Sequence, residues 1–288
     1  MPLNKNVCLE KVPCDFCGGN DLKLIFRQRD DYINAYKNYE YAFPVVSCLR
    51  CGLVFVNPRP TKESIGFFYP DHYHDERLPG TMSHRYQRQS TFLPNLRGGG
   101  VILDVGCAKG DFLGWLAKSH ILKMYGCDAY SGGIREGYSI DFLGKDLPDC
   151  HYPTAYFDYV TSWAVLEHVH TPKIYFNEIA RILKPAGTFV FVVPNFNSLM
   201  CRVSKRDDIA RHIYQFTPKS IANYLRTSGF SSWNIQFDDT IFDGRGTGAV
   251  MALFGSKRPF RWLDRIIFNF HWEKHLRIGG TMLITATK

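Results

Sequence analysis

A glycine-containing turn within residues 101–113 carries the strongest chemical signal in the sequence. A run of branched apolar residues reaches Asp104, breaks at Gly106 and Gly110, and resumes as the apolar start of a helix. This order is typical of a buried parallel strand that feeds a glycine turn and then a helix. At such a turn the backbone approaches a ligand closely, and the N–H groups of the helix start face it. We therefore expect a ligand site here; the alternative is an ordinary strand–helix turn of some other α/β protein.

The spacing of this turn separates two ligand classes. A dinucleotide fingerprint needs small residues at its second and third marked positions, where this sequence has Ala108 and Asp111, and an aspartate poorly fits a close helix–strand contact. With Asp104 just before the turn, the run resembles motif I of class I S-adenosylmethionine-dependent methyltransferases, D-x-G-x-G-x-G, with Ala108 in place of the middle glycine. The resemblance implies that S-adenosylmethionine is the cofactor and that these residues bind it: Asp104, Gly106, Cys107, Ala108 and Gly110.

Four cysteines form a second group of chemical interest. Cys14 and Cys17 make one C-x-x-C pair, Cys48 and Cys51 make another, and thirty residues separate the two pairs. Two such pairs supply four thiolates suited to tetrahedral zinc, whereas a redox site would have one pair before a helix. We expect structural zinc with no role in the chemistry, because four thiolates leave no open coordination position.

Further cofactor contacts are expected at the end of the second strand, in the loop before the fourth strand and at the end of the fourth strand. Asp128 follows a predicted strand, 22 residues past the first glycine of the turn; there a carboxylate can accept two hydrogen bonds from a ribose, although a solvated strand-end aspartate is common. Asp149 resembles the family's acid that accepts from the adenine amino group, with the Cys150 N–H facing the ring, and a plain turn is the rival interpretation. Ala129 and Trp163 complete the predicted cofactor contacts.

Two histidine-containing segments are the candidates for catalysis. The block V-L-E-H-V at 165–169, followed by L-K-P-x-G at 183–187, resembles the regions after the fourth and fifth strands of this methyltransferase class, which makes His168 a residue of the cofactor floor. The segment from His212 to Pro218 resembles the H-x-x-Y/F-F-S/T segment over the substrate pocket of zinc-knuckle sugar methyltransferases, in which the matching histidine has been proposed as a base. His212 is therefore the candidate base, with Tyr214 and His168 behind it; a structural hydrogen bond is the alternative role for His212.

The elements that must position these residues alternate between strand and helix after residue 98. With the resemblance, this pattern predicts an α/β fold: a Rossmann-like seven-stranded methyltransferase sheet with a small N-terminal zinc-binding β module. We expect a zinc-binding module at 1–60, a helical and polar linker at 61–97, and a methyltransferase domain at 98–288 with an insert at about 240–280. Within that insert, residues 259–274 are apolar at helical spacing and basic elsewhere, as in a lid, a dimer face or a peripheral membrane contact.

Composition limits the partners. The 288 residues are 45% hydrophobic with a net charge of +8, which indicates a globular protein with an anionic partner. A small-molecule acceptor, a nucleotide-linked sugar or a phosphorylated glycan precursor, is expected; an RNA methyltransferase and a non-catalytic cofactor-binding module are the alternatives, and nucleic acid is the less favoured partner. The following basic residues could clamp an acceptor phosphate: Arg202, Lys205, Arg206 and Arg211. An odd number of cysteines, nine, and an N-terminus without an apolar signal core predict a cytoplasmic protein, monomeric or homodimeric.

Overall fold

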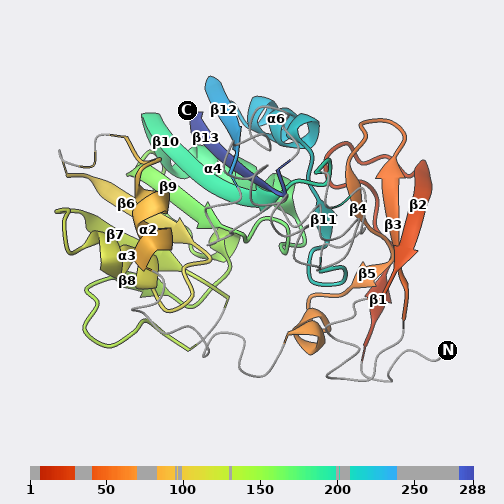
Figure 1. Ribbon diagram of the computed structural model, residues 1–288, viewed down its shortest axis with the longest axis horizontal. Coiled ribbons are helices and arrows are strands. Elements are labelled where there is room, and N and C mark those ends of the chain that lie inside the picture. The colour runs from red at the N-terminus through yellow and green to blue at the C-terminus, as the bar shows by residue number, and fades with distance from the viewer. Residues whose placement is uncertain are drawn as a thin grey trace, which may run out of the picture.

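The computed structural model describes residues 7–29, 41–69, 83–94, 96, 99–129, 132–198, 201, 208–238 and 279–288. Its larger part is a seven-stranded sheet with the strand order β12-β13-β10-β9-β6-β7-β8 (Figure 1). The strands are β6 (Val101–Val105), β7 (Lys123–Cys127), β8 (Asp141–Leu143), β9 (Phe157–Trp163), β10 (Leu183–Pro194), β12 (Ser232–Phe237) and β13 (Thr281–Thr287). Strand β13 runs antiparallel to both of its neighbours, and the other pairs are parallel. The predicted Rossmann-like seven-stranded sheet is confirmed.

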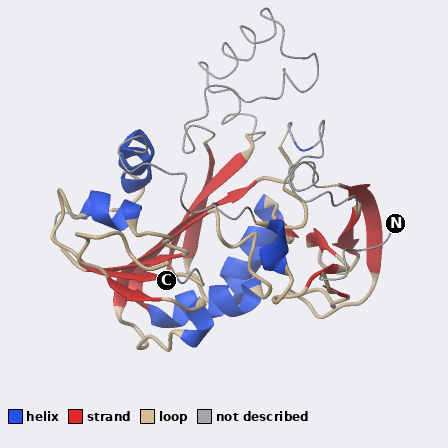
Figure 2. Cartoon of the chain, turned by 90° about the horizontal axis from the view of Figure 1, so that it is seen from below, coloured by secondary structure: helices blue, strands red, loops and turns tan. Residues whose placement is uncertain are grey.

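Helices cover both faces of this sheet (Figure 2). Alternate residues of β10 point to opposite faces, so Phe189 and Phe191 join one apolar cluster and Val190 joins another. The first cluster includes residues of α4 (Pro172–Ile182) and α6 (Pro218–Thr227), and the second includes residues of α2 (Ser83–Ser90) and α3 (Asp111–Leu116). Two short 3-10 helices, η1 (Ile65–Phe68) and η4 (Leu147–Asp149), lie in the connections.

The N-terminal module, here residues 7–29 and 41–60, contributes two small sheets. One is two-stranded, and the other has the order β11-β4-β3-β2. Their strands are β1 (Leu9–Glu10), β2 (Leu22–Gln28), β3 (Phe43–Cys48), β4 (Val54–Val56), β5 (Arg59–Pro60) and β11 (Tyr214–Gln215). Strand β11 belongs in sequence to the larger part and lies between it and the module (Figure 1). One continuous apolar cluster includes Phe55 of the module and both Phe176 and Tyr224 of the helices, so the two parts share a core.

Two predictions fall on segments that this structure does not describe. Most of the predicted insert at 240–280, including the amphipathic stretch 259–274, lies outside the described residues. So do Arg202, Lys205 and Arg206 of the predicted phosphate clamp. Among the residues that are described, no helix is both long enough and apolar enough to cross a membrane.

Candidate functional site

The glycine turn (residues 106–110) is locked onto the carboxyl ends of β6 and β7. The N–H groups of Gly106 and Cys107 donate to the Cys127 carbonyl at 2.8 and 3.3 Å. The Ala108 N–H donates to Asp128 Oδ2 at 2.8 Å. Asp128 therefore holds the turn in place. The sequence did not indicate this role, which is additional to the predicted contact with a ribose.

The backbone of Gly106 shows why the turn needs a glycine there. Its φ is +75°, and a Cβ at this position would lie 2.3 Å from Val165 Cγ2, far closer than real carbon atoms approach. Val165 begins the segment that carries Glu167 and His168. This close contact therefore seats that segment directly against the glycine turn.

Asp104 is a buried carboxyl at the base of the turn. It lies opposite Thr161 and Gly126 in the sheet and is 2% exposed. The Thr161 hydroxyl donates to Asp104 Oδ1 at 2.6 Å. Burial, together with the negative charge of Asp128, raises the pKa of Asp104 from an ordinary value of 3.8 to about 7, although the Thr161 bond and the charge of Arg85 oppose the shift.

The remaining predicted cofactor residues lie around the same strand ends. Trp163 ends β9, where its ring makes an edge contact with Phe112 at 5.1 Å, and Ala129 is exposed just after β7. Asp149 is exposed at the end of η4. The Cys150 N–H donates to the Leu147 carbonyl within this helical turn, at 3.2 Å, so the structure gives that N–H a partner in the protein.

A second group of polar side chains, the histidine cluster, consists of Tyr69, Glu167, His168 and His212. The rings of His168 and His212 meet edge to face, with their centroids 4.6 Å apart. His168 Nδ1 lies 3.0 Å from the Tyr69 hydroxyl and 3.1 Å from the Arg211 carbonyl. Because a carbonyl can only accept, the Arg211 contact favours a proton on Nδ1.

Burial within this cluster favours the neutral form of His168. Its side chain is 16% exposed, and Glu167 Oε1 lies 4.0 Å from its Nε2. Burial, reinforced by the nearby His212, lowers the pKa of His168 well below its usual value of 6.5. His212 Nε2 lies 3.8 Å from Asp208 Oδ2. The Glu167, His168 and His212 ligand atoms lie within 4.8 Å of one another, so their residue types could also hold an ion.

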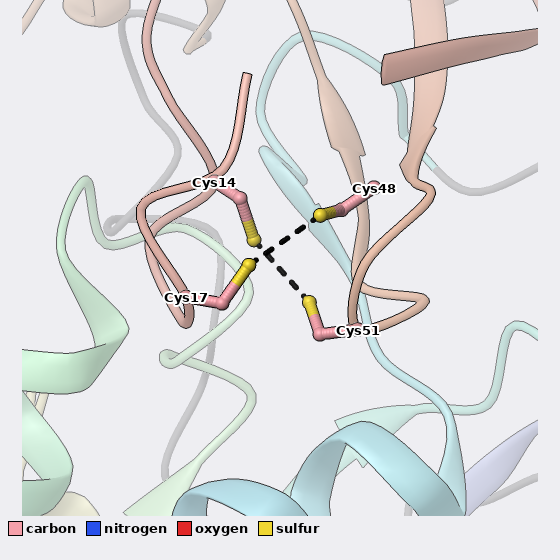
Figure 3. A group of neighbouring side chains, drawn as sticks. All are labelled: Cys14, Cys17, Cys48 and Cys51. Atoms are coloured by element: carbon pink, nitrogen blue, oxygen red, sulfur yellow. Dashed lines mark hydrogen bonds between the residues drawn. The ribbon is translucent and has the colours of Figure 1, made fainter. Parts of the chain in front are cut away.

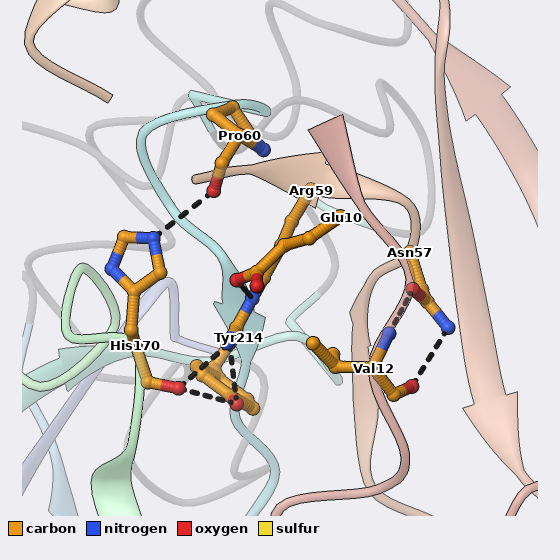
Figure 4. A network of polar contacts seen from close by, with 7 residues as sticks. All are labelled: Glu10, Val12, Asn57, Arg59, Pro60, His170 and Tyr214. Atoms are coloured by element: carbon orange, nitrogen blue, oxygen red, sulfur yellow. Dashed lines mark hydrogen bonds and ion pairs between the residues drawn. The ribbon is translucent and has the colours of Figure 1, made fainter. Parts of the chain in front are cut away.

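Tyr214, the second candidate for catalysis, lies outside the histidine cluster. It is 1% exposed; its hydroxyl donates to the His170 carbonyl at 3.1 Å and accepts from Arg59 Nη1 at 3.0 Å (Figure 4). Arg59 Nη1 also donates to the His170 carbonyl, and its Nε donates to Glu10 Oε1. Arg211, the described member of the predicted phosphate clamp, is 5% exposed and pairs with Asp208 at 2.9 Å.

The four cysteines converge as the sequence predicts (Figure 3). The sulfurs of Cys14 and Cys51 are 3.4 Å apart, those of Cys17 and Cys48 are 3.5 Å apart, and all four lie within 4.8 Å of one another. Tetrahedral zinc, with Zn–S bonds of about 2.3 Å, places its sulfurs about 3.8 Å apart. Burial raises the pKa of Cys14 and raises that of Cys51 to about 11, whereas backbone hydrogen bonds lower the pKa of Cys48 to about 7. A cation would therefore be needed to hold Cys14 and Cys51 as thiolates. The cluster thus fits zinc.

Sequence reasoning missed three residues that hold this region. Asp15, Arg59 and Thr161 each bond to a residue at least 57 positions away, and no local pattern signals such contacts. Tyr69 had a weak signal, because it belongs to an aromatic stretch before the sheet.

Comparisons with known proteins agree with this geometry. A family model for a methyltransferase domain matches residues 74–235, more than half of the chain. An S-adenosylmethionine-dependent methyltransferase of Mycolicibacterium smegmatis is 25% identical over 183 residues, covering 61% of this chain and 68% of the relative. A tRNA (carboxymethyluridine(34)-5-O)-methyltransferase of Arabidopsis thaliana is 30% identical over 114 residues, which cover 38% of this chain and 28% of the plant protein; the match thus spans under a third of that relative.

Solved structures show the same fold. Phosphoethanolamine N-methyltransferase 2 of Haemonchus contortus, in complex with S-adenosyl-L-methionine, has a TM-score of 0.56 and 14% identity over 94% of this chain and 70% of that one. A chain from the complex between the Haloferax volcanii Trm112 methyltransferase activator and a methyltransferase has a TM-score of 0.55 and 19% identity, covering 75% of this chain and 96% of that one. At these identities the likeness concerns the fold alone.

Proposed function

The chain belongs to the methyltransferase-domain family and is an S-adenosylmethionine-dependent methyltransferase, and on that premise we propose that its acceptor is a small anionic molecule, a nucleotide-linked sugar or glycan precursor. One observation carries this proposal. The Val165 contact with Gly106 sets the histidine cluster directly beside the glycine turn, where an acceptor could meet the transferable methyl group. The net charge of +8 supports an anionic acceptor.

The residues of the turn fit the cofactor. The missing Cβ of Gly106 makes room for the Val165 side chain against the turn, and the buried Asp104 offers a counter-charge to a cation. We propose that Asp128 and Ala129 bind the ribose, that Asp149 and Cys150 flank the adenine, and that Trp163 closes the side near the acceptor. When bound, S-adenosylmethionine supplies an electrophilic methyl group on a sulfonium.

The protein's own contribution is alignment and, where the acceptor must lose a proton, a base. Holding two reactants in line contributes up to about 7–11 kcal/mol. We propose that His212 takes the proton, because the lowered pKa of His168 makes that neighbouring imidazole a weak base. His168 and Tyr69 would orient the acceptor, and the buried Tyr214 would support the loop behind them.

We also propose that Cys14, Cys17, Cys48 and Cys51 hold structural zinc and that the chain divides into a zinc-binding module at 1–60, a linker at 61–97 and a catalytic domain at 98–288. Sulfur separations of 3.4 and 3.5 Å support the first point.

The test is incubation with methyl-labelled S-adenosylmethionine and a panel of nucleotide-linked sugars, total RNA and neutral sugars, read by mass spectrometry. The proposal is supported if a nucleotide-linked sugar becomes labelled. An excess of the same free nucleotide should prevent this labelling, and His212→Gln should strongly reduce it. Label on RNA, or on neutral sugars in preference to anionic ones, refutes it. The zinc site is tested separately by metal analysis of Cys17→Ser, with Cys8→Ser as the matched control, because Cys8 is an exposed thiol outside the cluster.

A further inference from the structure

The four-cysteine cluster carries a carboxylate that reaches into the larger part of the protein. Asp15 lies between Cys14 and Cys17. Its Oδ2 accepts from the Lys173 N–H at 3.0 Å and from the Tyr224 hydroxyl at 2.7 Å. Beside it, the Phe16 ring packs edge-on against Tyr224 at 5.1 Å, and the Phe16 carbonyl accepts from Lys173 Nζ at 3.3 Å.

These contacts supply a helix cap from a distant part of the chain. Helix α4 begins at Pro172, and its N-cap residue, Thr171, makes no side-chain capping bond. The first-turn N–H groups of a helix lack intrahelical partners, and a carboxylate satisfies them best. Asp15 does so for α4, across 158 positions of sequence.

The start of α4 is joined to the histidine cluster. Only two residues, Val169 and His170, separate His168 from Thr171, so moving the first turn of the helix moves the segment that carries His168. The same segment is fixed from its other side by the module, since His170 Nε2 lies 3.0 Å from the Pro60 carbonyl and Arg59 donates to the His170 carbonyl (Figure 4).

The position of His212 depends on the module as well. Strand β11 begins two residues later and pairs with β4, with Tyr214 opposite Phe55. The Val56 N–H donates to the Ile213 carbonyl at 2.8 Å, and the Tyr214 N–H donates to the Glu167 carbonyl at 3.1 Å. The module thus meets both histidine-bearing segments, one through Asp15 and Arg59 and the other through β4.

We propose that the metal-loaded module positions the acceptor site, and that Asp15 is the positioning residue that links the four-cysteine cluster to the histidine cluster. This positioning role rests on the proposed function, because that function defines the acceptor site. The contacts themselves can be measured without an acceptor. The glycine turn has its own anchors at the carboxyl end of β7, in the Cys127 carbonyl and in Asp128, so loss of this link should spare the cofactor site.

The experiment follows four readouts in the zinc-loaded full chain: zinc content, affinity for S-adenosylhomocysteine, the exchange rate of the Lys173 amide, and the NMR signals of the His168 and His212 rings. The ring signals are assigned with His168→Gln and His212→Gln. In Asp15→Ala we expect retained zinc and unchanged affinity, shifted ring signals, and exchange of the Lys173 amide about fivefold faster, the ratio typical of a lost helix cap. Asp15→Asn keeps an acceptor oxygen and should recover most of the change. Asp21→Asn, an exposed acid of the same module, should match the wild type.

Several results would overturn the positioning role. One is Asp15→Ala with faster Lys173 exchange but unmoved ring signals; another is an equal shift in Asp21→Asn. A fall in cofactor affinity in step with the exchange rate would show general destabilisation instead. If Asp15→Ala does not fold, Tyr224→Phe removes one of the two donors to Asp15 and must shift the same ring signals by a smaller amount. Removal of zinc by a chelator must move them too. If no acceptor of the panel is methylated, the proposed function is refuted. The NMR spectra still test the positioning role of Asp15, because they need no acceptor.

Discussion

We expect the buried carboxyl of Asp104 to make cofactor binding dependent on pH. In the free protein its pKa is about 7, so at pH 7 about half of the molecules carry a proton there. A bound sulfonium cation favours the ionised carboxylate, which lowers the pKa and expels the proton. We therefore expect S-adenosylmethionine to release about half a proton at pH 7, and its affinity to rise about tenfold between pH 6 and pH 8, or about 1.4 kcal/mol.

Calorimetry in buffers with different ionisation enthalpies measures this release directly. S-adenosylhomocysteine, which lacks the sulfonium charge, should release fewer protons. Asp104→Asn should bind the cofactor more weakly and lose both the proton release and the rise in affinity. Proton release that is undiminished in Asp104→Asn would contradict the placement of Asp104 beside the cation. The absence of proton release in the wild type would contradict it as well.

The same carboxyl affects stability with a defined sign. Its pKa is raised on folding, so between about pH 4 and pH 7 the native state binds more protons than the unfolded state, and the free energy of unfolding falls as the pH rises. The full effect is of the order of 4 kcal/mol for a shift from 3.8 to about 7. Without cofactor, Asp104→Asn should therefore be more stable than the wild type at pH 8, as measured by urea unfolding, with the difference shrinking towards pH 4.

Four further outcomes test other parts of the structure. Gly106→Ala should abolish binding of S-adenosylhomocysteine in calorimetry, because the residue has a φ of +75°, which costs about 1–2 kcal/mol for alanine, and a Cβ has no room. Arg59→Ala should lower the free energy of unfolding by about 3 kcal/mol in urea titrations, since the buried arginine bonds to three groups. His212→Gln should lower kcat by about 10²–10⁴-fold on a confirmed acceptor with unchanged cofactor affinity; an unaltered rate would remove it as the base. Cys17→Ser should lose the zinc that Cys8→Ser retains, as metal analysis would show, and equal metal in both would count against the cluster.

Local sequence signals indicated the glycine turn and mark the starts of two helices. A threonine before a proline is typical of a helix start. At Thr217-Pro218 the threonine caps α6 reciprocally with Ser220, the Ser220 N–H donating to Thr217 Oγ1 at 3.2 Å. Thr171-Pro172 likewise marks the start of α4, but this pattern does not identify the capping group. Thr171 makes no side-chain bond, and Asp15 takes its place. A helix cap can be predicted from neighbouring residues only when the capping side chain is close to the helix in sequence.

The candidate site was less predictable, because its residues converge from separate parts of the chain. The cysteine spacing alone indicated the cluster at Cys14, since a tetrahedral site restricts which residues can form it. By contrast, the motif that includes His212 gives no sign that Tyr214 turns away from it. The orientation follows from the pairing of β11 with β4 and from the bond to Arg59, neither of which can be seen in a seven-residue segment.

The N-terminal module meets the segment after His212 at β11, which has only two residues. A two-residue strand forms too few hydrogen bonds to hold a position by itself, yet His212 lies two residues before it. Its register depends on Phe55 of the module and on the Glu167 carbonyl of the larger part. A change on either side must therefore reach the histidine cluster, whereas Asp104 is held by contacts within the larger sheet. We therefore expect cofactor binding and acceptor placement to depend on different contacts, of which only those for the acceptor extend to the four cysteines.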